Sequence, residues 1–217
     1  MQVLPDTSIA TDPPNTIPND GTNACVFLAL SICDTFLQTG KKVASVSWEE
    51  LAKLADKTIT KLPGKINPFR NATERYDPLD AKAILTANNL LSANYELSEE
   101  CNTSYGVFTE SGRQQLINAF SKHASSESKN HVGVFTCGKY TFLVGINGGS
   151  FFLVDTHPIG EELGGNGNGI LVAAHDTGNR SCKLLVQWIM KRLLCSGVVP
   201  SDAQSFAWLM AFHKPGL

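Results

Sequence analysis

The stretch HVGVFTCGKYTFLVGINGGSFFLVDTHPIG, residues 131–160, decides the fold class of this chain. It contains three runs rich in Val, Phe, Ile and Tyr, at residues 131–136, 139–146 and 150–156. Each run has the length and composition of a β-strand, and short glycine-containing turns separate them. We therefore predict an antiparallel meander of three strands over this stretch.

The chain before the meander has the apolar spacing of helices. From Cys25 to Leu37 the apolar residues recur at intervals of three and four, which predicts a mostly buried helix that Gly40 ends. Three further helices are predicted from similar spacing, one that Ser47 caps and Pro63-Gly64 stop, one over residues 77–91 and one over residues 111–124.

After the meander we predict a short strand at residues 170–174 and a helix at 181–194. Periodicity does not separate a strand from a short helix in the apolar segment 205–213, and we favour a last strand there. Helices followed by an antiparallel sheet define the α+β class. Residues 1–18 contain four prolines and are predicted to form an extended arm that could link to an upstream segment. Residues 19–217 are then one domain, as a length of 217 residues allows.

Composition and charge narrow the classes of function. Hydrophobic residues make up 42% and charged residues 18%, which indicates a globular protein. The net charge is −2 with scattered Lys and Arg, so neither nucleic acid nor a membrane surface is expected as a partner. No apolar run approaches the ~20 residues of a membrane span. Without a visible secretory signal, we expect a reducing intracellular compartment, cytoplasm or nucleus.

Two places in the chain could carry chemistry, and Cys25 is the first. A helix N-terminus carries a partial positive charge, which favours thiolate over thiol and brings free backbone N–H groups to an adjacent anion. A cysteine that starts a core helix is also a common buried residue with no chemical role. The six cysteines show no paired ligand spacing, so we expect no metal site and no cofactor.

The second place is the pair Asp155 and His157, at the end of a predicted strand. Residues i and i+2 of a strand share a face, so the carboxylate can hold one imidazole nitrogen and leave the other as a base. A capped strand end or a surface histidine is the alternative interpretation. His157 lies 132 residues after Cys25, which resembles the separation of about 130–150 in papain-like enzymes. The papain signature around the cysteine is absent, and the acidic residue precedes the histidine.

The motifs NDGTNACVFLAL (19–30) and FFLVDTHPIG (151–160) resemble the cysteine deubiquitinases of herpesvirus large tegument proteins. They are still more similar to the cellular and transposon-borne viral tegument-like deubiquitinases. The resemblance spans roughly residues 15–213, although only the two motif regions are specific. It implies a papain-like cysteine protease fold, with the nucleophile at the N-terminus of a buried helix packed on an antiparallel sheet. It also implies that Cys25 is the nucleophile, His157 the general base and Asp155 its orienting partner.

The resemblance leaves the oxyanion donor open. Tegument enzymes use a glutamine well upstream of the cysteine, and this chain has none between Gln2 and Cys25. Asn19 precedes Cys25 by six residues, the offset of the oxyanion glutamine in papain-like enzymes, and its amide can donate the same hydrogen bond. Asn15 and Asn23 are alternatives, and Asn19 could equally be a simple turn residue.

A deubiquitinase also needs a narrow channel for the C-terminal Gly-Gly of ubiquitin. We predict that Gly145, Gly148, Gly149 and the loop at residues 160–169 supply close-approach backbone for such a channel, unless they are only turn glycines. The expected partner is ubiquitin or a polyubiquitin chain.

The expected function is therefore hydrolysis of the (iso)peptide bond after this Gly-Gly through a thioester intermediate. One alternative is a protease for the ubiquitin-fold modifier, whose family has Asp-Pro-His where this chain has Asp155-Thr156-His157. A non-catalytic ubiquitin-binding module and a peptidase or amidase for short peptides are the others.

Overall fold

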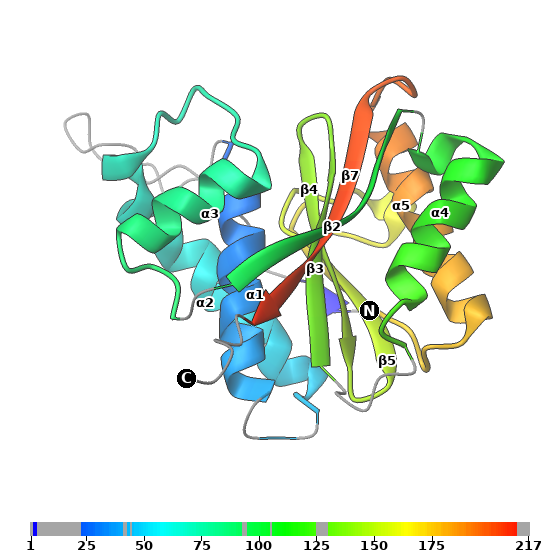
Figure 1. The fold of residues 1–217 in the computed structure, drawn as a ribbon, viewed down its shortest axis with the longest axis horizontal. Coiled ribbons are helices and arrows are strands. Elements are labelled where there is room, and N and C mark those ends of the chain that lie inside the picture. The colour runs from blue at the N-terminus through cyan, green and yellow to red at the C-terminus, as the bar shows by residue number, and fades with distance from the viewer. Residues whose placement is uncertain are drawn as a thin grey trace, which may run out of the picture.

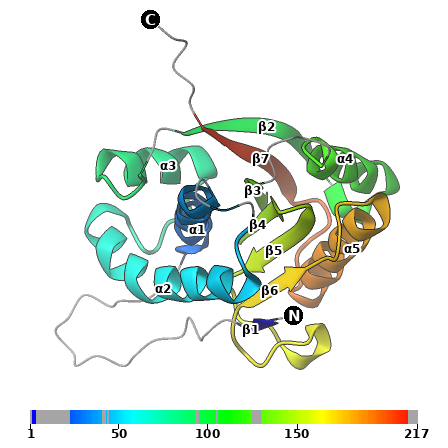
Figure 2. The same ribbon diagram turned by 90° about the horizontal axis from the view of Figure 1, so that it is seen from below.

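A central antiparallel sheet with helices on both faces makes up the computed structural model of this protein (Figures 1 and 2). The structure describes residues 2–3, 23–40, 43, 45–92, 95–104, 106–124 and 130–211. The arm predicted at residues 1–18 lies outside these ranges except for Gln2–Val3, which form the short strand β1. The mixed helix and antiparallel-sheet class predicted from the sequence is confirmed.

Five α-helices and seven strands form the described part of the chain, with three short 3-10 helices between them. The helices are α1 (Cys25–Gly40), α2 (Trp48–Ile66), α3 (Pro78–Ala87), α4 (Glu110–Ser121) and α5 (Asn179–Cys195). The strands after β1 are β2 (Tyr95–Ser104), β3 (Asn130–Cys137), β4 (Tyr140–Asn147), β5 (Ser150–Asp155), β6 (Ile170–Ala173) and β7 (Ala203–Ala211). No helix in the described ranges has both the length and the apolar character needed to cross a bilayer.

The sheet order is β1-β6-β5-β4-β3-β7-β2, and every neighbouring pair is antiparallel. The predicted meander is confirmed as β3, β4 and β5, and the predicted last strand is confirmed as β7. Strand β2 was not predicted, because its sequence YELSEECNTS is polar and lacks a clear apolar alternation. It lies at the edge of the sheet and pairs only with β7, where polar side chains are tolerated.

The helix ends follow local signals in part. Ser47 caps α2 as predicted, with its Oγ accepting from the backbone N of Glu50 at 3.2 Å. The predicted end of this helix at Pro63-Gly64 is wrong, since α2 continues to Ile66. The side chains of Pro63 and Ile66 are both buried. Helix α3 ends earlier than predicted, because Asn89 adopts a left-handed φ of 54° just after it.

The sheet buries apolar side chains on both of its faces. Along β5, Phe152 and Val154 pack with α1, α2 and α3, whereas Phe151 and Leu153 pack with α4 and α5. The two-residue period of a strand therefore directs Asp155 toward the side of α5. Figure 1 shows α1–α3 and α4–α5 on opposite sides of the sheet.

Candidate active site

Cys25 is the first residue of α1 and lies where β4 begins. The carbonyl of Ala24 accepts the first hydrogen bond of the helix, from Leu28 N at 2.9 Å. The Cys25 Sγ lies 3.6 Å from the carbonyl oxygen of Lys139 and 3.6 Å from Thr141 Oγ1. The backbone N–H of a residue in the first helical turn has no acceptor within its own helix. The half-buried thiol thus sits beside a backbone donor that the helix itself leaves unpaired.

Asp155 and His157 meet at the end of β5. Asp155 is fully buried, and its Oδ1 lies 2.6 Å from His157 Nδ1. The same oxygen accepts from the backbone N of His157 at 2.9 Å. The strand ends at Asp155, so the two side chains meet through a turn held by the aspartate and not through the two-residue period of a strand.

The imidazole of His157 also interacts with Cys25, since each of the two groups shifts the pKa of the other. The rings of Tyr140 and Phe142 stand edge-on to the imidazole, with centroids 4.9 Å and 6.3 Å away. The ring of His157 is therefore held on several sides between the carboxylate and the thiol.

The charges of this group favour an ionised pair. Burial raises the pKa of the Cys25 thiol, but the hydrogen bond and positive charge of His157 outweigh it and leave the pKa below its ordinary value. Burial lowers the pKa of His157, but the charge and hydrogen bond of Asp155 raise it overall to about 10. A thiolate beside an imidazolium is the form that a nucleophilic cysteine needs.

Arg192 joins this group, although the sequence analysis did not single it out. Its Nε donates to Asp155 Oδ2 at 2.8 Å, and the guanidinium is buried. Burial raises the pKa of Asp155, but the charges and hydrogen bonds of His157 and Arg192 lower it overall. No local pattern marks Arg192, because a basic residue in the last turn of a helix is common.

The predicted oxyanion donors are placed only in part. Asn19 and Asn15 lie outside the described residues. Asn23 precedes α1 with a left-handed φ of 53°, and its Nδ2 donates to the carbonyl oxygen of Ala72 at 3.0 Å. The amide of Asn23 is therefore engaged with the segment between α2 and α3.

The structure does not bring the predicted channel glycines to Cys25. Gly148 and Gly149 form the turn after β4 with φ of 56° and 88°, a conformation that favours glycine. This turn lies at the opposite end of β4, roughly 25 Å away at about 3.3 Å per residue. Gly145 lies within β4, where a Cβ would come 2.5 Å from the ring of Phe152. Turn geometry therefore explains the glycines at 148 and 149, and close packing against Phe152 explains the glycine at 145.

The loop at residues 160–169 does lie next to His157. Backbone hydrogen bonds connect Ile159 to Asn168 and Gly167. A Cβ at Gly169 would lie 2.7 Å from the carbonyl oxygen of Asp155. Glycine at this position therefore allows the loop to pack directly against the backbone of Asp155 and Thr156.

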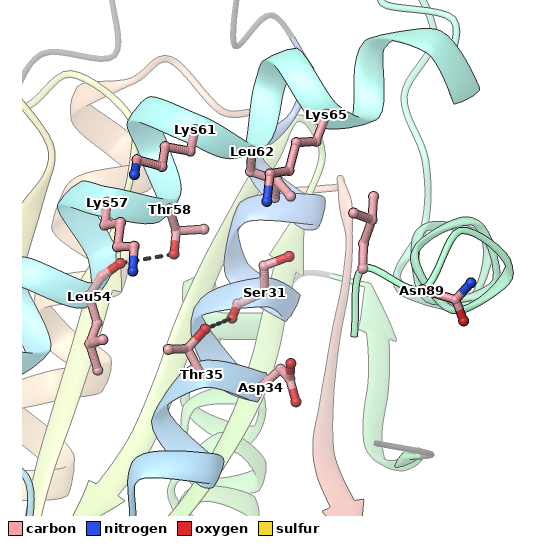
Figure 3. Close-up of a pocket in the computed structure, with 11 residues that line it drawn as sticks. Ser31, Asp34, Thr35, Leu54, Lys57, Thr58, Lys61, Leu62, Lys65 and Asn89 are labelled. Atoms are coloured by element: carbon pink, nitrogen blue, oxygen red, sulfur yellow. Dashed lines mark hydrogen bonds between the residues drawn. The ribbon is translucent and has the colours of Figure 1, made fainter. Parts of the chain in front are cut away.

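A separate hollow of about 260 Å³ lies between α1, α2 and the end of α3 (Figure 3). Ser31 and Asp34 line it from α1, and three lysines line it from α2. In Figure 3 the side chain of Lys61 extends away from α1, whereas Lys65 extends toward it, so the ammonium groups do not converge. Since Cys25 and His157 are not among the lining residues, this hollow is not part of the candidate active site.

Among the residues that the structure describes, no three His, Cys, Asp or Glu side chains lie close enough together to bind a metal ion. The chemistry available to Cys25 and His157 is proton transfer and nucleophilic attack.

Comparisons with known proteins give matches in structure only. No family model matches this chain, and no curated protein matches it in sequence. One similar structure is the ubiquitin-specific protease encoded by murine cytomegalovirus tegument protein M48, in complex with a ubiquitin-based suicide substrate. It has 12% identity and a TM-score of 0.49, over 100% of this chain and 90% of that chain. The Pseudomonas avirulence protein AvrPphB has 10% identity and a TM-score of 0.39, over 85% and 92%.

Proposed function

We propose that this chain is a papain-like cysteine protease that releases ubiquitin from its conjugates. One observation supports the protease chemistry above all others. Cys25, at the N-terminus of α1, interacts with His157, which lowers the pKa of its thiol, and His157 Nδ1 lies 2.6 Å from the buried carboxylate of Asp155. Cys25 is then the nucleophile, His157 the general acid and base, and Asp155 the residue that orients the imidazole.

In the proposed reaction, the Cys25 thiolate attacks the carbonyl carbon of the C-terminal glycine of ubiquitin. The backbone N–H of Cys25 donates to the developing oxyanion, and Asn19 is the proposed second donor. The imidazolium of His157 gives its proton to the departing lysine amine, which leaves a thioester on Cys25. His157 then takes a proton from water, whose attack on the thioester releases ubiquitin and restores the thiolate.

Ubiquitin as the substrate rests on a different observation from the protease chemistry. The arrangement of Cys25, His157 and Asp155 would serve acyl transfer from many substrates. The choice of ubiquitin comes from the resemblance of residues 19–30 and 151–160 to the tegument-like deubiquitinases. The proposal includes a single protease domain over residues 19–217 and an intracellular location.

The proposed function is tested with ubiquitin that carries an electrophile at its C-terminus. We expect the wild-type protein to form one covalent adduct, which peptide mass spectrometry assigns to Cys25. Cys25→Ala should form no adduct and should lose several orders of magnitude in the rate of ubiquitin-chain cleavage. Cys195→Ala is the matched control, because Cys195 is an exposed free thiol and its loss should change neither result.

Other outcomes would contradict the proposal in distinct ways. Chain cleavage by Cys25→Ala at a rate near that of the wild type would rule out the nucleophile. Labelling by a probe built on the ubiquitin-fold modifier, with none by the ubiquitin probe, would change the substrate. Binding of ubiquitin without adduct or turnover would indicate a non-catalytic module, and activity on short peptides alone would indicate a peptidase.

A further inference from the structure

Arg192 is a buried cation at the end of α5, in the helix layer opposite α1. It is 6% exposed, whereas the neighbouring Lys191 on the same turn is exposed to solvent. Burying a guanidinium costs free energy unless its donors are paired. Its partners therefore indicate what the side chain is there to hold.

All three guanidinium nitrogens of Arg192 have partners. Nε donates to Asp155 Oδ2 at 2.8 Å, and Nη2 donates to the carbonyl oxygen of Pro158 at 3.2 Å. Nη1 donates to the hydroxyl of Ser196, one turn further along the chain. One rigid fork thus holds the carboxylate that precedes His157 and the backbone that follows it.

The same guanidinium supports the imidazole from a second side. Its Cζ lies 5.1 Å from the centre of the Tyr140 ring, and that ring stands edge-on to His157 at 4.9 Å. Arg192 therefore reaches His157 by two routes, through Asp155 and through Tyr140, without contacting Cys25.

The four side chains form a row of alternating charge when the cysteine and histidine are ionised. Arg192 and His157 are positive, and Asp155 and Cys25 are negative, so the row is neutral. Without Arg192, the same row would carry a net charge of −1 in a site where burial makes unbalanced charge costly. Loss of the guanidinium should therefore disfavour the thiolate.

We infer that Arg192 is a positioning residue for the proposed reaction, one that fixes Asp155 and the segment around His157 and balances the charge of the Cys25–His157 pair. This inference rests on the proposed function, because it assigns Arg192 a part in activating Cys25 as the nucleophile.

The test measures how fast iodoacetamide alkylates Cys25 at each pH, with mass spectrometry of the Cys25 peptide, and needs no knowledge of the substrate. Arg192→Met keeps length and removes charge, and we expect the midpoint of the alkylation curve to rise by about one pH unit. Arg192→Lys keeps the charge, so its midpoint should stay near that of the wild type. Lys191→Met is the matched control and should leave the curve unchanged.

Ubiquitin-chain cleavage provides the second readout. Arg192→Met should lower kcat by about 10- to 100-fold with little change in KM. In an Asp155→Asn background the same change should have a smaller effect, because the route from Arg192 through the Asp155 carboxylate is already lost. Circular dichroism reports whether each variant folds. If Arg192→Met does not fold, Arg192→Lys carries the test, since lost fixation should lower its kcat while its alkylation midpoint stays near that of the wild type.

An unchanged alkylation midpoint in folded Arg192→Met, or unchanged kcat in folded Arg192→Lys, would overturn the inference and leave Arg192 a purely structural residue. These results differ from failure of the proposed function. If the wild-type protein ignores the ubiquitin probe while the alkylation midpoint still shifts in Arg192→Met, the substrate assignment fails and the role of Arg192 in activating Cys25 stands.

Discussion

At the residue scale, a neighbouring charge gives the thiol of Cys25 a lower pKa than the thiols of two other cysteines in the chain, Cys101 and Cys137. Burial raises the pKa of Cys101 to about 11 and that of Cys137 to about 12. Cys25 is subject to the same effect of burial, but the imidazolium of His157 lowers its pKa overall. Burial alone would have made Cys25 inert, so its proposed reactivity depends on a residue far along the sequence.

The hydroxyl of Thr141 lies 3.6 Å from the Cys25 sulfur and lowers the pKa of the thiol. Thr141→Val keeps the shape of the side chain and removes this partner of the thiolate. We expect the pH midpoint of Cys25 alkylation to rise by a few tenths of a unit, as the loss of one hydrogen bond implies. Thr141→Ser keeps the hydroxyl and is the control. Equal midpoints for Thr141→Val and the wild type would exclude this role.

His157 also couples stability to pH. Its pKa is about 10 in the folded protein against an ordinary value of 6.5, so between these values the folded state holds a proton that the unfolded chain releases. This contribution is fully present below about pH 6.5 and is lost as the pH rises toward 10. We therefore expect the urea midpoint of Cys25→Ala to fall more steeply with pH than that of Cys25→Ala/His157→Gln. Parallel curves for the two variants would contradict the raised pKa.

At the scale of elements, the cap of α2 is a local feature that the sequence alone predicted. Ser47→Ala removes the acceptor of the Glu50 backbone N–H, and we expect the free energy of unfolding to fall by about 1 kcal/mol. Thr60→Ala, at an exposed position inside the same helix, is the control and should be neutral or slightly stabilising. The measurement is urea unfolding followed by circular dichroism. Equal losses in both variants would mean that Ser47 does not act as a cap.

At the scale of the whole molecule, the candidate site forms where the two helix layers meet at one end of the sheet. Helix α1 brings Cys25 from one layer, and α5 brings Arg192 from the other. The start of β4 and the end of β5 supply Thr141 and Asp155 between them. The site therefore depends on how the sheet positions both layers and not on any single element.

The strand β7 is central to that arrangement, since it lies between β3 and β2 and is the partner of β2 in the sheet. Removing residues 203–217 deletes the buried Trp208, exposes the core residues that pack against it and leaves β2 unpaired. We expect this variant to lose cooperative thermal unfolding. Removing residues 1–3, which include only the two-residue edge strand β1, should shift Tm far less. A cooperative transition in the first variant would show that the sheet is complete without β7.

The sequence by itself determined the class of fold, the meander of β3–β5, and the pair of places where chemistry was expected. These features depend on the periodicity of apolar residues and on turn and cap signals, and both can be read from residues that are close together in the sequence. The tertiary structure alone decided the interaction of Cys25 with His157 and the place of Arg192. It also separated Gly148 and Gly149 from the site. The physical reason is that such contacts join residues far apart in the chain, and only the packing of both layers on the sheet brings them together.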